Sequence, residues 1–146
     1  MSGMTPLLDV VPFARTLGIR FESVTPTSAV AVLPDTAEHH NHLGGPHAGA
    51  LFTLAETASG AIVLAAFSSA LDRAVPLAVR ATIKYQKLAM GTVSAHASLQ
   101  RPADAVLAEL DAGQRPEFDV LVTLRNAEGT PTAEMTVTWT LRPNRT

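Results

Sequence analysis

The stretch PHAGALFTLAETASG, residues Pro46–Gly60, sets the architecture of this 146-residue chain. Its alanines, glycines and leucines are typical of a helix buried inside a domain. Between Leu43 and Leu71, Glu56 is the only Asp, Glu, Lys or Arg. Carboxylates are rarely buried unless a partner or a chemical role keeps them there. We therefore take Glu56 as the first candidate functional residue. The alternative is a structural acid that bonds to backbone or to a nearby Ser or Thr.

Short elements precede this helix. The residues Pro6–Leu17 favour one or two helical turns that Pro residues interrupt. Ile19–Val24 and Ala29–Leu33 have β-rich compositions and flank a Thr-Pro-Thr-Ser turn, so they predict a hairpin. A polar loop follows, and Pro46 suits the first turn of the long helix because a missing N–H costs nothing there.

After the helix, the hydrophobic period changes from about 3.6 residues to two. Apolar residues occupy every second position in Val79–Tyr85, Val93–Leu99, Phe118–Leu124 and Met135–Leu141. This alternation predicts antiparallel strands with one face inward and a polar, wet outer face. Pro102–Gly113 predicts a short inserted helix. We expect an α+β fold in one domain, residues 1–146, with an antiparallel sheet of five to six strands around one long central helix.

Composition excludes several classes of function. A formal net charge of -2 and 5% aromatic residues disfavour a nucleic-acid partner. The absence of cysteine excludes disulfides, thiolate metal sites and a Cys nucleophile. The first residues do not resemble a secretory signal, and the unbroken apolar run Ala61–Phe67 is too short to span a membrane. We expect a cytoplasmic protein with no membrane partner.

The start of the long helix is a second candidate site. Its first N–H groups have no partners within the helix, so they suit a carbonyl oxygen that is becoming an oxyanion. Gly44 and Gly49 keep side chains away from that approach, and Asn41 and His47 stand beside it. A turn-forming role for Asn41 and a capping role for His47 are the structural alternatives.

The helix is too long for one chain to complete such a site. Glu56 lies nine positions after His47, which places it ~13 Å farther along the axis at ~1.5 Å per residue. A two-fold dimer would bring Glu56 of one subunit to the opening amides of the other. We therefore expect a homodimer, with a higher homo-oligomer left open.

These residues resemble a known family. Asn41–Gly49, NHLGGPHAG, followed by Leu54–Glu56, LAE, resembles the Asn-x-x-Gly-x-x-His-Gly-Gly and Leu-Ala-Asp/Glu pattern of hotdog-fold acyl-CoA thioesterases. The phenylacetate-degradation group is the nearest type. Ala48 replaces the first Gly of the pair, and the His-Ala-Gly-Ala-Leu form resembles an uncharacterised branch of the superfamily.

The resemblance implies a hotdog fold and a hydrolase that acts on a small or medium acyl-CoA thioester. Glu56 would be the general base or the nucleophile, and Asn41 and His47 would orient water or substrate. No cofactor is implied beyond the coenzyme A of the substrate. The implied substrate-binding positions are Gly44, Ala48, Gly49, Thr57, Gly60 and Tyr85.

Other functions remain open at this point. The same fold could bind acyl-CoA without turnover, or it could act as a dehydratase or isomerase. A metal site built on the loop histidines His39, His40 and His42 is not expected, because no carboxylate set is spaced with them. Outward cations such as Lys87 could meet coenzyme A phosphates.

Overall fold

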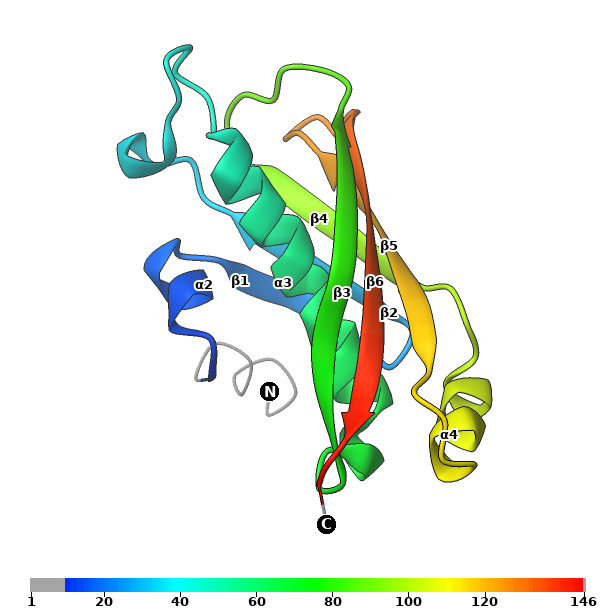
Figure 1. Cartoon of the computed structure of the whole chain (residues 1–146). Helices are drawn as coiled ribbons and strands as arrows, with labels where there is room; N and C mark the ends of the chain where they lie inside the picture. The colour runs from blue at the N-terminus through cyan, green and yellow to red at the C-terminus, as the bar shows by residue number, and fades with distance from the viewer. Residues whose placement is uncertain (1–9, 146) are drawn as a thin grey trace.

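The computed structural model describes residues 10–145. In this range a six-stranded sheet, with every neighbouring pair antiparallel, wraps around the helix α3 (Figure 1). The strand order is β1-β2-β4-β5-β6-β3. The predicted α+β arrangement is therefore confirmed. The strands are β1 Arg20–Val24, β2 Ser28–Leu33, β3 Ala74–Tyr85, β4 Val93–Leu99, β5 Glu117–Arg125 and β6 Pro131–Pro143; the helices are α2 Pro12–Thr16, α3 Ala48–Ala66 and α4 Ala103–Asp111, with short 3-10 turns η1 Ala37–His39 and η2 Ser68–Ala70.

The helix α3 forms the centre of the core. It packs mainly on β2 and β4 and then on β5. Leu54 and Ile62 are fully buried, and each such side chain contributes about 1.5–3 kcal/mol of hydrophobic stabilisation. By length and composition α3 could span a membrane, but 61% of its apolar window is buried inside the protein. Packing against the sheet therefore accounts for its apolar sequence.

The helix begins two residues later than the sequence suggested. His47 is the N-cap residue and Ala48 is the first helical residue. Pro46 lies outside the first turn because it pairs with His40 in an isolated antiparallel bridge. At the other end the helix continues beyond Gly60 to Ala66.

The predicted alternation holds in three of the four later strands. The inward residues of β4, β5 and β6 are buried from Val93 to Ala97, Phe118 to Leu124 and Met135 to Leu141. The strand β3 differs, because Val79 is 42% and Tyr85 46% exposed. It lies at one edge of the sheet, and its register shifts between Ala78 and Arg80. The inward set predicted for this strand is therefore only partly covered in one chain.

The outer sheet face is not wet throughout, which corrects the sequence prediction. Thr138 and Thr140 of β6 are 5% and 1% exposed. Their hydroxyls donate to Asp119 Oδ1 at 2.6 Å and to the Pro116 carbonyl at 2.7 Å. These hydrogen bonds satisfy the two buried hydroxyls, which other segments of the same chain cover.

The peripheral elements follow the sequence closely. The predicted β1–β2 hairpin forms, and the Ser28 carbonyl accepts a hydrogen bond from the Thr25 N–H across the predicted turn. In the N-terminal segment, Pro12 begins α2, and Gly18 ends this region with φ +73°. The first part of the predicted Pro6–Leu17 helical region lies outside the described residues. The inserted helix is α4. Glu109 of this helix forms an ion pair at 2.6 Å with Arg101, which lies just before the helix begins.

Candidate functional site

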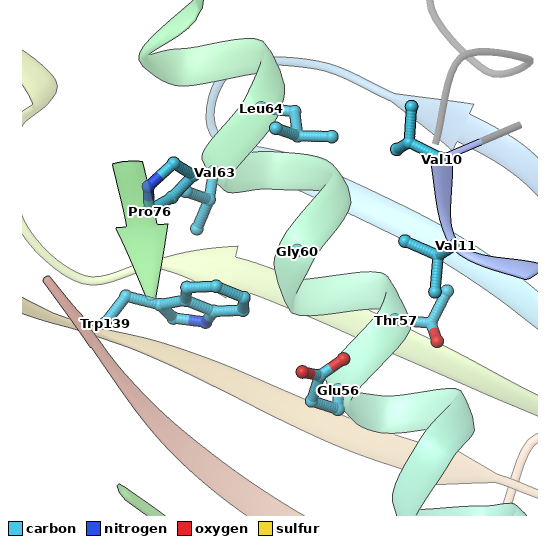
Figure 2. Close-up of a pocket in the computed structure, with 9 residues that line it drawn as sticks. All are labelled: Val10, Val11, Glu56, Thr57, Gly60, Val63, Leu64, Pro76 and Trp139. Carbon is cyan, nitrogen blue, oxygen red and sulfur yellow. The ribbon is translucent and has the colours of Figure 1, made fainter. Parts of the chain in front are cut away.

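Glu56 lies midway along α3, at one end of an apolar cavity of about 230 Å³ (Figure 2). We call this the Glu56 cavity. Its side chain is half-buried, and burial raises the pKa of the Glu56 carboxyl. No cation or hydrogen-bond donor among residues 10–145 offsets that effect. The cavity is lined by Val10, Val11, Glu56, Thr57, Gly60, Val63, Leu64, Pro76 and Trp139.

A buried hydrogen-bond chain supports the Glu56 turn of the helix. The Trp139 indole Nε1–H donates to Ser59 Oγ at 3.1 Å, and the Ser59 hydroxyl donates to the Glu56 carbonyl at 2.7 Å. This chain fixes the plane of the indole against α3. Sequence reasoning missed Trp139 and Ser59 as site residues. The available signal was a single Trp on the inward face of the last strand and a Ser in an apolar helix.

The start of α3 is capped by its own chain. His47 Nδ1 accepts a hydrogen bond from the Gly49 N–H at 2.8 Å. Because Nδ1 accepts, the ring proton of neutral His47 lies on Nε2. A Cβ at Gly49 would lie 3.1 Å from Nδ1, so Gly49 lets the ring reach its amide. The Ala48 N–H, by contrast, has no hydrogen-bond acceptor among the described residues.

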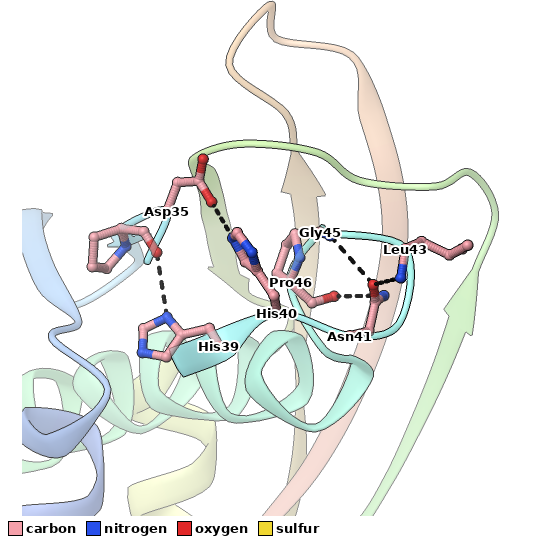
Figure 3. A network of polar contacts seen from close by, with 8 residues as sticks. Asp35, His39, His40, Asn41, Leu43, Gly45 and Pro46 are labelled. Carbon is pink, nitrogen blue, oxygen red and sulfur yellow. Dashed lines mark hydrogen bonds and ion pairs between the residues drawn. The ribbon is translucent and has the colours of Figure 1, made fainter. Parts of the chain in front are cut away.

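Asn41 organises the loop that leads to the helix (Figure 3). Its Oδ1 accepts from the Leu43 N–H at 2.8 Å and from the Gly45 N–H at 3.3 Å. Its Nδ2 donates to the Pro46 carbonyl at 3.4 Å. Gly44, at φ +81°, supplies the left-handed backbone conformation in this turn. The structure thus uses the Asn41 side chain within its own loop.

The loop histidines have separate partners. His40 Nε2 lies 2.7 Å from Asp35 Oδ1, and His39 Nδ1 lies 3.3 Å from the Pro34 carbonyl (Figure 3). Within residues 10–145, no three His, Asp or Glu side chains gather closely enough to hold a metal ion.

Tyr85 joins the edge strand to the helix start. Its hydroxyl donates to the Ala48 carbonyl at 3.0 Å, and partial burial raises the pKa of the phenol. The phenol is therefore protonated at neutral pH and can donate this hydrogen bond. With Asn41 and Ala48 it lines a second cavity, of about 320 Å³, which Lys87 also borders.

One chain does not bring the predicted site residues together. Glu56, Thr57 and Gly60 line the Glu56 cavity, whereas Asn41, Ala48 and Tyr85 line the second one. A third cavity, of about 460 Å³, is bordered by His47 and Gly49 together with residues of α2. Gly44 borders none of these three cavities. The separation along α3 agrees with the distance argument from the sequence.

Comparisons with known proteins place the chain in a family. The family described as "Domain of unknown function (DUF4442)" matches residues 5–141. None of the curated proteins matches the chain.

Solved structures extend this likeness. A protein of unknown function from Pseudomonas aeruginosa, described as a probable thioesterase, is 28% identical, with a TM-score of 0.87 over 98% of this chain and 95% of its own. A thioesterase family protein from Silicibacter pomeroyi is 18% identical, with a TM-score of 0.75 over 94% of this chain and 93% of its own. A mutant thioesterase from Pseudomonas aeruginosa is 21% identical, with a TM-score of 0.74 over 90% of this chain and 86% of its own. The six-stranded sheet around α3 is therefore the hotdog fold, as the sequence resemblance implied.

Proposed function

The chain belongs to the DUF4442 family, and we propose that it is a hydrolase that cleaves acyl-CoA thioesters. The observation that carries the proposal is Glu56, a half-buried carboxylate that has no ion-pair partner among residues 10–145 and lies at one end of an apolar cavity. The description of the 28% identical Pseudomonas aeruginosa protein as a probable thioesterase supports the reaction class.

The raised pKa of Glu56 suits a general base that works near neutral pH. The carboxylate takes a proton from water, and the resulting hydroxide attacks the thioester carbonyl carbon. The tetrahedral intermediate carries its negative charge on the former carbonyl oxygen. Its collapse breaks the carbon–sulfur bond, and the thiolate leaves with the proton held by Glu56. The products are a carboxylic acid and free coenzyme A.

The oxyanion needs donors, and the start of α3 offers them. The Ala48 N–H is free of intrahelical bonding and lies at the positive end of the helix dipole. His47 can add its Nε2–H, because Nδ1 is occupied by the Gly49 amide. His47 thus acts as a hydrogen-bond donor to the substrate. Asn41 acts by holding the loop that positions these groups.

Two copies of the chain are required to complete this site. Glu56 lies eight residues beyond Ala48, or ~12 Å along the axis of the same helix. The strand β3 offers a surface for a second copy, since it is a 12-residue edge strand with half-exposed apolar residues. Long uncovered edges are normally paired or protected in stable proteins. Antiparallel pairing of two β3 edges around a two-fold axis would create two equivalent sites.

A thiol-release assay on a panel of acyl-CoA substrates tests the reaction. Glu56→Gln should lower kcat/KM by about 10²–10⁴-fold, the usual contribution of a general base. Glu128→Gln makes the same chemical change in the exposed β5–β6 turn and should leave activity unchanged. Equal activity of wild type and Glu56→Gln would reject the mechanism. Saturable acyl-CoA binding without thiol release would indicate a binding protein instead.

Subunit mixing tests the shared site. Ala48→Pro removes one N–H donor, and proline is well tolerated at the first position of a helix. His47 already has the extended ψ of 145° that a following proline requires. Each variant alone should lose most of its activity. An equal mixture of Ala48→Pro and Glu56→Gln subunits should recover about a quarter of wild-type activity, because half of the dimers then contain one intact site out of two. No recovery in dimers shown to exchange subunits would reject the shared site.

A further inference from the structure

The Glu56 cavity has one polar end and one apolar end, and this difference indicates how a substrate would lie in it. Figure 2 shows Glu56 and Leu64 at opposite ends, with Gly60 and Trp139 between them. Polar groups occur at the Glu56 end, where the Thr57 hydroxyl also lies. The remainder of the wall is aliphatic or aromatic. A reacting carbonyl belongs at the Glu56 end, and an apolar chain belongs toward Leu64.

We propose that this cavity holds the acyl chain of the substrate, that it accepts straight acyl chains of about six to eight carbons, and that the gap between Gly60 and Trp139 controls how far a chain extends toward Leu64. This inference rests on the proposed thioester hydrolysis. It adds a substrate class and the residues that select it.

The volume of the cavity carries the size estimate. At about 230 Å³ it is roughly one and a half times the ~150 Å³ cavity that binds one benzene molecule in another protein. At the same packing it would hold about nine carbon atoms, which leaves a chain of six to eight carbons with its carbonyl near Glu56. A long fatty acyl chain would not fit within these walls.

Gly60 is a position where the absence of a side chain creates space. A Cβ placed there would lie 3.7 Å from both Trp139 Cζ2 and Cη2, which is an ordinary van der Waals contact. Gly60 lies within regular helix, where glycine is less favourable than alanine. The backbone does not require glycine here. The gap between the helix and the indole is about one methyl group wide, and the substitution Gly60→Ala would fill it.

Trp139 provides a wall that does not give way easily. The indole is 8% exposed, and its Nε1–H is held by Ser59 Oγ, which is itself fully buried. Rotation of the ring would break this bond and leave a buried donor without a partner. On the opposite side of α3, Val11 of the N-terminal segment also lines the cavity (Figure 2). A fixed wall of this kind gives a defined limit to chain length.

Chain-length profiles of kcat/KM test the assignment. Wild type should be most active on hexanoyl-CoA and octanoyl-CoA and much less active on hexadecanoyl-CoA. Gly60→Ala should move the optimum to shorter chains and lower the octanoyl-to-butanoyl ratio by at least ~10-fold, the effect of a methylene in a fitted pocket. Trp139→Phe should move it to longer chains. Ala65→Ser adds one atom to the same helix outside the cavity and should leave the ratio unchanged. Circular dichroism checks that each variant is folded.

The failure of this inference can be distinguished from failure of the proposed reaction. Calorimetry with non-hydrolysable alkyl thioethers of coenzyme A measures the same length limit without turnover. If thioethers show a limit that Gly60→Ala shortens while no thioester is cleaved, the reaction is wrong and the pocket stands. If wild type cleaves all chain lengths equally, or Gly60→Ala changes the ratio less than about two-fold, the pocket assignment is overturned. Should Trp139→Phe not fold, the Gly60→Ala profiles decide alone.

Discussion

Replacement of Ser59 by alanine removes the hydroxyl that joins the edge of the indole to the Glu56 turn. Ser59 is fully buried and bonds on two sides, accepting from Trp139 Nε1 at 3.1 Å and donating to the Glu56 carbonyl at 2.7 Å. The substitution leaves the Trp139 N–H buried without an acceptor, which costs about 1–3 kcal/mol. The lost bond to the Glu56 carbonyl costs about 1 kcal/mol more. The better helix propensity of alanine returns about 0.5 kcal/mol.

We therefore expect Ser59→Ala to lower the free energy of unfolding by about 1.5–3.5 kcal/mol. For a chain of this length that corresponds to about 2–4 °C in Tm for each kcal/mol. Urea unfolding is the assay, followed by circular dichroism at one matched protein concentration, because oligomerisation shifts apparent stability. Trp139 is the only Trp in the chain, so its fluorescence gives a second probe at the site of the change.

A double-mutant cycle tests the reasoning behind that number. Trp139→Phe removes the donor, so the penalty for an unpaired N–H disappears in the double variant Ser59→Ala/Trp139→Phe. The double variant should be less destabilised than the sum of the single variants by at least ~0.5–1 kcal/mol. Strict additivity, or a loss below ~0.5 kcal/mol for Ser59→Ala alone, would show that the hydrogen-bond chain has no energetic role.

Three single positions give further predictions. Glu56→Gln should be at least as stable as wild type at pH 7, and this difference in stability should shrink as pH falls. The reason is that burial raises the pKa of Glu56, so the wild-type fold loses stability as pH rises through that folded-state pKa. Urea unfolding at pH 7 and pH 4 measures this, and an advantage that grows at low pH would contradict it. Gly45→Ala should destabilise the protein by about 1–3 kcal/mol, because its Cβ would lie 2.6 Å from the Ala89 carbonyl oxygen; thermal unfolding measures the loss, and an unchanged Tm refutes it. Tyr85→Phe removes the hydrogen bond to the Ala48 carbonyl and should cost about 0.5–1.5 kcal/mol in urea unfolding, whereas a neutral result would mean that the contact contributes nothing.

The sequence supported the fold more fully than the site. Apolar composition located α3, which is buried on all sides from Thr57 to Val63, and a hydrophobic period of two located β4, β5 and β6, each of which buries one continuous face. It misjudged the exposure of β3, because alternation does not reveal which strand lies at an edge. It also misjudged the burial of Thr140, which a carbonyl on a distant loop satisfies.

Among the site residues, too, the sequence predicted some features and could not decide others. Glu56 stood out because it is the only charge in a long apolar stretch, and the structure places it on a cavity. The local partners of Asn41 and His47 lie within a few residues of each, which is why a turn role and a cap role could be foreseen as alternatives. Their part in catalysis remains a prediction.

The sequence by itself determined the buried helix, the alternating strands and the isolated acid, since each follows from residue type and spacing within one segment. Tertiary structure alone decided that Trp139 meets Ser59 across 80 residues of chain and that Gly60 opens space beside the indole. It also decided that the His47 ring occupies the Gly49 amide. Such contacts depend on the register between β6 and α3 and on side-chain rotamers, which local sequence patterns do not encode.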